Sequence, residues 1–354
     1  MKIIVDAMGG DNAPDEIVKG ALAAALEDKI EVVLAGRGED ILRSIEKMGL
    51  SELPRGVEIV NASETIDADE DPTNAIRNKK DSSLTVALTL LRDGRADAFV
   101  SAGSTGAILA GATLIVKRVR GLRRAALAPL IPNSGGGFIL IDCGANVECT
   151  PEYLLQFAFM GSYHAEDVLQ LKNPRVGLLN NGSERTKGTP LQLEAYALLE
   201  KAGREGHINF IGNVEAKAAL VDACDVLVCD GFTGNVFLKS VEGTASLLMS
   251  ELKSVFKQSC MTKFAYVLLK KHFGGLKAKL DPDKVGGTMM LGISKPVIKA
   301  HGGSNAVAIT NAIRQAVIAV RADTAARLQA NIGRMKVEET ENDEKAIDKS
   351  EPTL

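Results

Sequence analysis

Tryptophan is missing from this 354-residue chain, and aromatic residues make up only 4% of it. Nucleic-acid bases therefore have few rings to stack on, and a formal net charge of −3 also argues against a general nucleic-acid binder. No apolar run approaches the roughly eighteen residues that span a bilayer, and the first residues form a strand-like run instead of a signal peptide. We therefore expect a cytoplasmic protein that binds no nucleic acid.

Cofactor signatures are also lacking. The five cysteines form no Cys-x-x-Cys pair, and the histidines at 164, 207 and 272 share no metal-ligand spacing. The chain contains neither the Gly-x-Gly-x-x-Gly fingerprint of dinucleotide sites nor the Gly-Lys-Ser/Thr of a Walker loop. We expect no cofactor and no metal, and the cysteines favour small buried thiols in a reducing cytoplasm.

The chain does have a clear alternation of strand-like and helix-like segments, which predicts a three-layer α/β/α fold with a mostly parallel sheet. The expected strands are 2–6, 31–35, 57–60, 98–101, 138–142, 175–179, 208–211, 226–229 and 297–299. The expected helices include 15–26, 39–48, 83–92, 105–119, 190–202 and 305–332. No repeat or linker interrupts the pattern, so we expect a single α/β catalytic domain over 1–335 and an acidic, disordered tail over 336–354.

Six short loops rich in Gly, Ser, Asn and Asp follow apolar runs, where strands are expected to end. They are Asp6–Asp11, Ser101–Gly106, Asp142–Glu148, Asn180–Gly188, Asp230–Asn235 and His301–Asn305. Glycine lets backbone amides approach a ligand, and a following helix start adds unpaired N–H groups. Open α/β sheets bind ligands outside the carboxyl ends of their strands. The loops therefore predict a cleft that holds a phosphate or a carboxylate.

Two loops carry the clearest anion chemistry. Asn180–Gly188 places two cations, Arg185 and Lys187, beside hydroxyl donors that suit one phosphate, with a solvated surface turn as the alternative. Ser101–Gly106 offers the hydroxyls of Ser104 and Thr105 at an expected helix start, where a tight turn with an N-cap is the alternative.

The other loops are more ambiguous. Asp142–Glu148 and Asp230–Asn235 each place an acid at a strand end, where it would bind a cation, orient other side chains or stabilise a turn. His301 precedes a Gly-Gly-Ser-Asn turn and is a candidate donor or proton carrier. In the first loop, two adjacent glycines permit close backbone approach, and Asp11 either faces the ligand or caps the next helix.

A basic segment interrupts the alternation. Between residues 252 and 280 there are seven lysines and no aspartate or glutamate, and apolar residues recur mostly at helical spacing. Such a basic amphipathic helix lies on an anionic membrane surface, gaining about 1 kcal/mol per nearby lysine, or attracts an acidic protein. A helical hairpin with a solvated lysine face is the simpler alternative.

Six motifs follow one another along residues 1–330. They are Asp-Ala-Met-Gly-Gly-Asp at 6–11, Ser-Ala-Gly-Ser-Thr-Gly-Ala at 101–107, Gly-Ala-Asn-Val at 144–147, Gly-Asn-Val-Glu at 212–215, Asp-Gly-Phe-Thr-Gly-Asn-Val at 230–236 and Ile-Lys-Ala-His-Gly at 298–302. Together, and in this order, they resemble the motifs of the bacterial phosphate acyltransferase (PlsX) family. The lysine before glycine in Asn180–Gly188 is a looser match, and the acidic tail lies outside the shared pattern.

This resemblance implies a homodimeric cytoplasmic enzyme that associates peripherally with the inner face of the cell membrane. It would transfer a long-chain fatty acyl group from acyl-[acyl-carrier-protein] to inorganic phosphate, giving acyl phosphate for phospholipid synthesis. The implied fold is similar to that of the isocitrate/isopropylmalate dehydrogenases and phosphotransacetylases, with neither nicotinamide nor a required metal.

These expectations suggest a role for each candidate residue. The catalytic candidates are Lys187, His301 and Asp230. The first two would assist departure of the thiolate. The phosphate-binding candidates are Gly9, Gly10, Asp11, Ser104, Thr105, Asn146, Asn235 and Gly302. The candidates for contact with the membrane or the acyl-carrier protein are Phe256, Lys257, Phe264, Leu268, Lys270 and Lys271.

Three other functions fit parts of the pattern. A phosphotransacetylase-like enzyme moving a short acyl group between phosphate and coenzyme A does not need the amphipathic lysine segment. A decarboxylating dehydrogenase would need NAD and a divalent metal, and the glycine fingerprint is missing. A membrane-recruited scaffold that binds carrier protein does not need several phosphate-suited loops. Phosphate acyltransfer is therefore the function that we expect.

Overall fold

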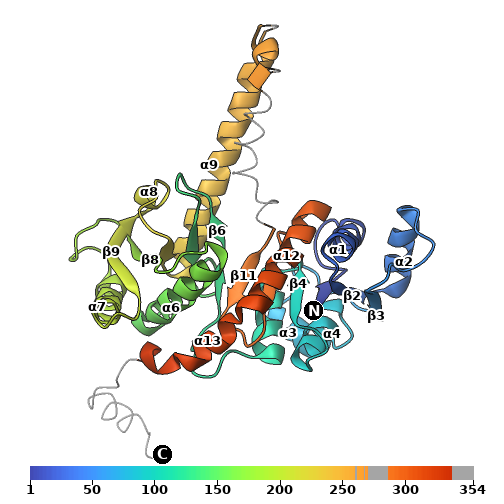
Figure 1. Cartoon of the computed structure of the whole chain (residues 1–354), viewed down its shortest axis with the longest axis horizontal. Coiled ribbons are helices and arrows are strands. Elements are labelled where there is room, and N and C mark those ends of the chain that lie inside the picture. Colours follow the sequence, from blue (N-terminus) through green and yellow to red (C-terminus); the bar gives the residue numbers. More distant parts are fainter. Residues whose placement is uncertain (260, 267, 270–285, 337–354) are drawn as a thin grey trace, which may run out of the picture.

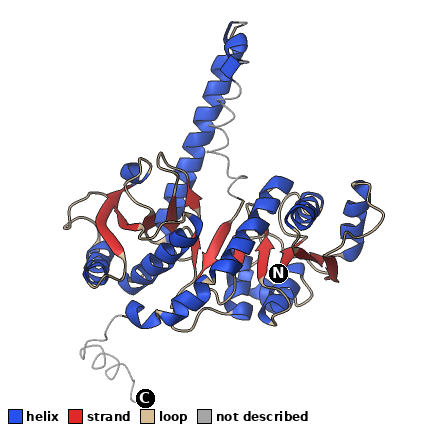
Figure 2. Cartoon of the chain, in the orientation of Figure 1, coloured by secondary structure: helices blue, strands red, loops and turns tan. Residues whose placement is uncertain are grey.

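The computed structural model describes residues 1–259, 261–266, 268–269 and 286–336. The chain forms two β-sheets side by side, with helices on both faces, and one long helix projects away from this body (Figures 1 and 2). Within the described ranges, no helix is both long enough and apolar enough to cross a membrane.

The larger sheet has seven strands and contains the first four strands of the chain. Its neighbouring strands are parallel, except that β11 is antiparallel to both of its neighbours. In spatial order the strands are β3 (Val57–Asn61), β2 (Glu31–Gly36), β1 (Lys2–Asp6), β4 (Ala98–Ser101), β12 (Val297–Lys299), β11 (Thr288–Leu291) and β5 (Ala126–Ala128). The carboxyl ends of β1, β4 and β12 therefore lie next to one another.

The smaller sheet has five strands, which are parallel except for β6 against β7. In spatial order they are β6 (Leu130–Ile131), β7 (Phe138–Ile141), β10 (Val226–Val228), β8 (Arg175–Asn180) and β9 (Asn209–Glu215). Only Pro129, which has no N–H for a ladder, separates β5 from β6, so one extended stretch links the two sheets.

Helices cover both faces of the paired sheets, and each face has its own core cluster that spans both sheets. One face is covered by α1 (Asp15–Asp28), α2 (Gly38–Lys47), α6 (Pro151–Val168), α7 (Pro190–Arg204), α12 (Ala306–Ala322) and α13 (Thr324–Ala330). The other is covered by α3 (Pro72–Asn78), α4 (Ser83–Arg92), α5 (Thr105–Gly111), α8 (Ala216–Ala219) and the start of α9 (Gly231–Lys257). The expected three-layer, mostly parallel α/β/α fold is confirmed.

All nine expected strands are present, but β5, β6 and β11 were not predicted. These three strands have two to four residues each, too few to show a period of two. The helix expected over 305–332 breaks at Asp323, whose φ of 46° is left-handed. The helix expected over 105–119 is α5 followed by a π-helical turn, η1 (Ala112–Val116).

The basic segment proves to continue a longer helix. Asp230 caps α9, so Asp230–Asn235, which we expected to be a loop, contains the first turn of this helix. Residues 261–266 are helical as well. Lys270 and Lys271, and the tail from residue 337, lie outside the described residues.

Candidate active site

Asp6, Ser101 and Lys299 form a row across three adjacent parallel strands. Ser101 is the register partner of Lys299, and the pairing of β1 with β4 places Asp6 beside Ser101. Each of the three residues is the last of its strand. Because registered neighbours point to the same face of a sheet, the side chains share the face that α4, α5 and α9 cover. This row is the base of the candidate site.

Asp6 is buried and joins the first two loops. Its carboxylate accepts hydrogen bonds from Ser101 Oγ at 2.7 Å and from the Met8 amide at 3.2 Å. Burial raises the pKa of Asp6 above its ordinary value, while these hydrogen bonds oppose the shift. Ser101 Oγ accepts in turn from the amide of Gly103 at 2.9 Å. Asp6 therefore holds the loop backbones in place.

The glycine pair of the first loop allows three loops to meet backbone to backbone. A Cβ on Gly9 would lie 2.5 Å from Asp6 Oδ2 and 2.8 Å from the nitrogen of Gly103. Gly10 has a φ of 106°, and a Cβ there would lie 2.9 Å from the carbonyl oxygen of Gly302. Only glycine fits at these two positions, because any side chain would push the loops apart.

Lys299 is a partly buried cation that sequence analysis did not single out. Its ammonium donates to the carbonyl of Ala300, and within the described residues it forms no ion pair with a carboxylate. Burial lowers the pKa of Lys299 to about 8; the charge of Lys239 lowers it too, and Asp11 opposes the shift. An ammonium that is removed from much of the solvent and has no carboxylate partner favours the binding of an anion. The available signal was a lysine ending an apolar strand in the Ile-Lys-Ala-His-Gly motif.

The loop after β12 packs on the loop after β1. The Asp11 amide donates to the Gly302 carbonyl at 2.9 Å, and Asn12 Nδ2 donates to the Gly303 carbonyl at 3.1 Å. His301 is exposed, and its Nδ1 accepts from the Gly303 amide at 3.2 Å. His301 thus faces solvent beside this loop contact, with Nε2 pointing away from that hydrogen bond.

Ser104 and Thr105 lie where the second loop enters α5. The side chain of Ser104 makes no capping hydrogen bond, although Ser104 occupies the N-cap position. Ser104 is partly exposed and Thr105 is exposed. Both hydroxyls are therefore accessible at the rim of the cluster formed by the first, second and last loops.

The loop after β7 is built around a buried aspartate. Asp142 has no exposed surface and accepts from the amides of Leu127, Cys143 and Asn146, at 2.8, 2.6 and 2.6 Å. Asn146 Nδ2 donates to Asp142 Oδ2 at 2.9 Å and to the Ala125 carbonyl at 2.8 Å. These contacts give Asp142 a turn-stabilising role. They also use both amide hydrogens of Asn146, which leaves that residue positioning the loop.

Asp230 and Asn235 belong to the start of α9. Both carboxylate oxygens of Asp230 accept from Thr233, one from its amide and one from Oγ1, each at 2.8 Å. Asp230 is therefore a helix cap in this structure. Asn235 is exposed in the first turn, and its Cγ lies 3.7 Å from where a Cβ on Gly144 would be. Its carboxamide is accessible to a ligand.

Helix α9 connects the loops of the two sheets. The amide of its first residue, Gly231, donates to the Asn146 carbonyl at 2.7 Å. One turn beyond Asn235, Lys239 is close enough to Lys299 for its charge to affect the pKa of that residue. The start of α9 therefore lies between the Asp142–Glu148 loop and the Asp6–Ser101–Lys299 row.

Lys187 lies at the carboxyl end of β8 and is exposed. Its amide donates to the Glu184 carbonyl, and its own carbonyl accepts from Asn180 Nδ2, both at 3.1 Å. These bonds stay inside the loop, and among the described contacts none joins Lys187 to the Asp6–Ser101–Lys299 row. The neighbouring Arg185 faces α7, where it pairs with Glu200 at 2.9 Å.

The cysteines are poor candidates for nucleophiles. Cys143, Cys224 and Cys229 are buried, as expected, and Cys149 is partly buried. Burial raises the pKa of Cys143, Cys149 and Cys224 to about 12 and that of Cys229 well above its ordinary value. Because a thiol reacts as its thiolate, these four stay unreactive near neutral pH.

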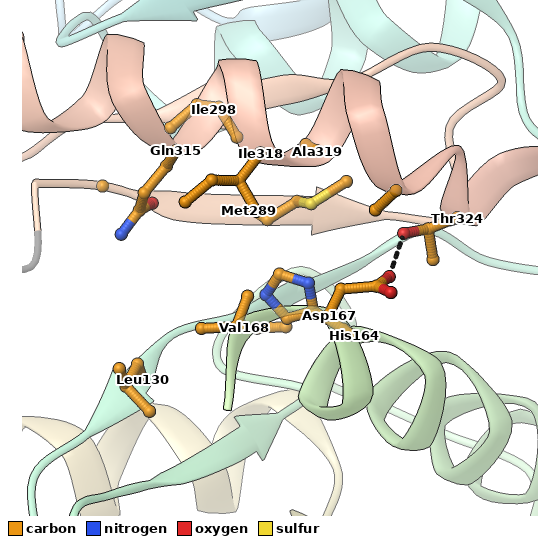
Figure 3. A pocket seen from close by; sticks show the side chains of 13 residues that line it. Leu130, His164, Asp167, Val168, Met289, Ile298, Gln315, Ile318, Ala319 and Thr324 are labelled. Atoms are coloured by element: carbon orange, nitrogen blue, oxygen red, sulfur yellow. Dashed lines mark hydrogen bonds between the residues drawn. The ribbon is translucent and has the colours of Figure 1, made fainter. Parts of the chain in front are cut away.

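A small apolar cavity lies on the opposite face of the larger sheet (Figure 3). Met289, Ile298, Ile318 and His164 are among the residues that line it, and burial lowers the pKa of His164 to about 4. Its volume of about 40 Å³ is close to the space that one water occupies, so it cannot hold a fatty acyl chain. None of the candidate site residues lines this cavity.

We call the end of α9 together with the helical stretch that follows it the α9 tip, which covers residues 247–259, 261–266 and 268–269. The apolar candidates in it differ in exposure. Phe264 and Leu268 are 65% and 66% exposed, and Lys257 is exposed too. Phe256 instead packs against Tyr266, with 5.4 Å between ring centroids. Phe256 therefore helps to join the two helical stretches.

Residues 1–327 match the model of the family described as fatty acid synthesis protein. The chain belongs to this family. Curated relatives in it are phosphate acyltransferases. The one from Thermoanaerobacterium thermosaccharolyticum is 44% identical over 332 residues, which is 94% of this chain and 97% of the relative. The one from Brevibacillus brevis is 45% identical over 343 residues, 96% of this chain and all of the relative. The chain is therefore an acyltransferase, as its motifs predicted.

Solved structures of other enzymes share the fold. A phosphotransacetylase from Streptococcus pyogenes matches with a TM-score of 0.60 at 18% identity, covering 92% of this chain and 94% of that one. A 4-hydroxythreonine-4-phosphate dehydrogenase from Klebsiella pneumoniae matches with a TM-score of 0.52 at 13% identity, covering 90% and 98%. At such identities the likeness concerns the fold alone, and it confirms the expected phosphotransacetylase-like architecture.

Proposed function

We propose that the enzyme transfers a long-chain fatty acyl group from acyl-[acyl-carrier-protein] to inorganic phosphate and releases acyl phosphate for phospholipid synthesis. The observation that carries this proposal is the partly buried Lys299, which has no carboxylate partner among the described residues and lies beside three loops of closely packed backbone. Membership in a family with phosphate acyltransferases supports the reaction class. The donor and the product are the parts that need experiment.

Phosphate is the nucleophile in this reaction. A substantial fraction of it is already the dianion near neutral pH, so the enzyme mainly has to position it and offset its charge. We assign Lys299 to the phosphate, with the accessible donors of Ser104, Thr105 and Asn235 at the rim. Lys187 is retained as a second cation for the substrate. It would have to reach the phosphate from its exposed loop.

The acyl donor is a thioester, so attack by phosphate oxygen on its carbonyl carbon creates an oxyanion and then expels a thiolate. Backbone amides of the glycine loops would stabilise the oxyanion. A thiol has a pKa of about 8.5, so proton delivery to the leaving sulfur should help only modestly. Lys187 and His301 are the candidates for that step, and Asp230 would act by fixing the start of α9.

A direct assay tests the reaction. Purified enzyme is mixed with long-chain acyl-carrier protein and phosphate, and acyl phosphate is trapped with hydroxylamine. We expect a hydroxamate that requires both substrates. A parallel reaction with acetyl-coenzyme A tests the phosphotransacetylase alternative, and hydroxamate formed only there would contradict the proposed donor.

We also propose that the end of α9 holds the enzyme on the anionic inner face of the membrane. Helix α9 projects away from the body of the protein (Figure 1). Its residues Leu247 and Leu248 are 62% and 54% exposed, and Met261, which follows the helix, is 81% exposed. The lysines at 253, 257 and 263 lie among these apolar residues and are exposed. Apolar insertion combined with attraction to anionic lipid is the chemistry of an interfacial helix.

Liposome flotation tests the membrane contact. The double variant Phe264→Asp, Leu268→Asp should lose binding to vesicles rich in anionic lipid, because both side chains are exposed and would no longer insert. Phe256→Leu is a matched control, since Phe256 packs on Tyr266 within the protein. Binding of the double variant at wild-type strength refutes this assignment.

We propose, finally, that the enzyme is a homodimer. The first turns of α9 expose Phe232 and Val236 at 62% and 51%, and the nearby Val147 is 64% exposed. Grouped apolar side chains of this kind are typical of subunit contacts. Sedimentation velocity should give twice the chain mass for the wild type. Phe232→Asp should shift the species toward the monomer.

A further inference from the structure

A run of cations follows η1 and leads toward the candidate site. Five of the eight residues from 117 to 124 are lysine or arginine. We call them the arginine patch, which consists of Lys117, Arg118, Arg120, Arg123 and Arg124. Val119 and Leu122 between them are only 4% and 5% exposed. The patch therefore presents charged side chains to solvent while its apolar residues anchor the segment to the body.

Among the described residues, acidic side chains pair with little of this charge. Arg123 approaches Glu152 at 3.4 Å, and Arg124 lies over the ring of Tyr153 at 5.3 Å. Among the described residues, the other three cations of the patch form no ion pair with a carboxylate. Uncompensated cations this close together attract an anionic partner and accelerate its binding.

The segment is held firmly and ends beside the site. The Arg123 amide donates to Gln156 Oε1 at 2.9 Å, and the Val119 amide donates to the Gly292 carbonyl at 2.9 Å. Directly after Arg124, the Ala125 carbonyl accepts from Asn146 Nδ2 at 2.8 Å. A macromolecule bound on the patch would thus stand next to the Asp142–Glu148 loop.

The chemistry of the patch differs from that of the α9 tip. The tip combines lysines with exposed Phe264 and Leu268, which suits insertion into lipid. The patch keeps its apolar residues inside and offers mostly arginine, whose planar guanidinium pairs well with carboxylates. An acidic protein surface fits the patch better than a bilayer does.

We propose that the arginine patch is the docking surface for the acidic acyl-carrier protein, so that its acyl thioester enters the site past the Asp142–Glu148 loop. This inference rests on the proposed function for the identity of the donor. It separates two surfaces: the patch receives the carrier protein, and the α9 tip contacts the membrane.

The test uses charge reversal in the full chain. The double variant Lys117→Glu, Arg120→Glu changes two exposed cations that have no ion-pair partner among the described residues. The control is Arg55→Glu, Lys172→Glu, which makes the same charge change at two exposed and equally unpaired positions elsewhere. Binding of fluorescently labelled holo-carrier protein is measured by anisotropy, without turnover. Flotation with anionic vesicles and KM values for acyl-carrier protein and phosphate are measured on the same samples.

We expect the patch variant to bind carrier protein at least tenfold more weakly at low salt, with a smaller difference in high salt. Its KM for acyl-carrier protein should rise similarly, while kcat, KM for phosphate and vesicle binding stay at wild-type values. Equal loss in the control overturns the inference, because net charge would then explain the effect. Loss of vesicle binding with intact carrier binding overturns it too, since the patch would then be a membrane contact. If the wild type binds carrier protein through the patch but forms no acyl phosphate, the proposed reaction fails and the docking surface stands.

Discussion

Lys299 on β12 lies directly across from Ser101 on β4, and the two side chains differ in what they contact. Ser101 donates to the buried carboxylate of Asp6 at 2.7 Å. Lys299 has only the Ala300 carbonyl and, within the described residues, no carboxylate. A neutral hydroxyl is thus satisfied by the protein, whereas the cation beside it is left for a ligand.

Replacing Lys299 by methionine removes this cation and keeps most of its volume. We expect the KM for phosphate to rise ten- to a hundredfold in Lys299→Met, because one charge-assisted hydrogen bond contributes about 1.5–3 kcal/mol. Lys295→Met, at a partly exposed lysine just before β12, is the control and should keep its phosphate KM. An unchanged phosphate KM in Lys299→Met removes that residue from the site.

In phosphate-free buffer at pH 7, the free energy of unfolding of Lys299→Met should be higher than that of the wild type. Burial lowers the pKa of Lys299 from 10.5 to about 8, so the unfolded chain holds this proton more tightly than the folded one. Below pH 8, charged Lys299 therefore lowers the free energy of unfolding of the wild type by as much as about 3 kcal/mol. This loss disappears as the pH rises from 8 to 10.5. Urea denaturation at pH 7 measures the gain. A loss of stability would mean that Lys299 is a structural residue.

Phosphate binding should weaken as the pH rises past 8. Above its pKa of about 8, Lys299 loses its charge in the free enzyme, so affinity should fall by about tenfold per pH unit. Calorimetric titration with inorganic phosphate between pH 7 and 9.5 measures the slope. Lys299→Arg stays charged throughout this range and should bind without the break. A wild type with flat affinity over this range contradicts the assignment.

Adding one methyl group at Gly9 should disturb the site directly. Its Cβ would lie 2.5 Å from Asp6 Oδ2 and 2.8 Å from the backbone nitrogen of Gly103, which cannot swing away as a flexible side chain can. We expect Gly9→Ala to lose about 1–3 kcal/mol of stability and more than tenfold in turnover. Gly243→Ala is the control: a Cβ there meets nothing within 4 Å, so this variant should gain up to about 1 kcal/mol. Equal behaviour of the two variants argues against tight loop packing.

Lys187→Ala tests the second cation. If Lys187 reaches the substrate, phosphate affinity or rate should fall ten- to a hundredfold, as for other charge-assisted contacts. Lys217→Ala is the matched control, because Lys217 is an exposed lysine of the same region that pairs with Glu215. Wild-type kinetics in Lys187→Ala would leave Lys299 as the principal phosphate cation.

Local pattern predicted the strands and helices well, because apolar period and helix caps depend on near neighbours. Ser83–Arg92 was expected and found with the same bounds, since its period is regular and Ser82 caps it. The short strand β11 lies between β12, a few residues later in the chain, and β5, which is more than 150 residues earlier. Its pairing with β5 depends on tertiary structure and could not be predicted from the local pattern. The first turn of α9 was read as a loop because its glycines are poor helix formers.

By itself, the sequence determined the fold class, the family and the loops in which site residues lie, because motif order and glycine spacing are properties of the chain. Only the tertiary structure decided which of those residues meet. It placed Lys299 beside Ser101, nearly two hundred residues earlier in the chain, through strand register. It also used Asp142 and Asn146 to hold a turn, and it left Lys299 partly buried with no carboxylate partner in the part of the chain that the structure describes. Burial and pairing depend on which atoms surround a group in space, and that is set when the two sheets and α9 pack together.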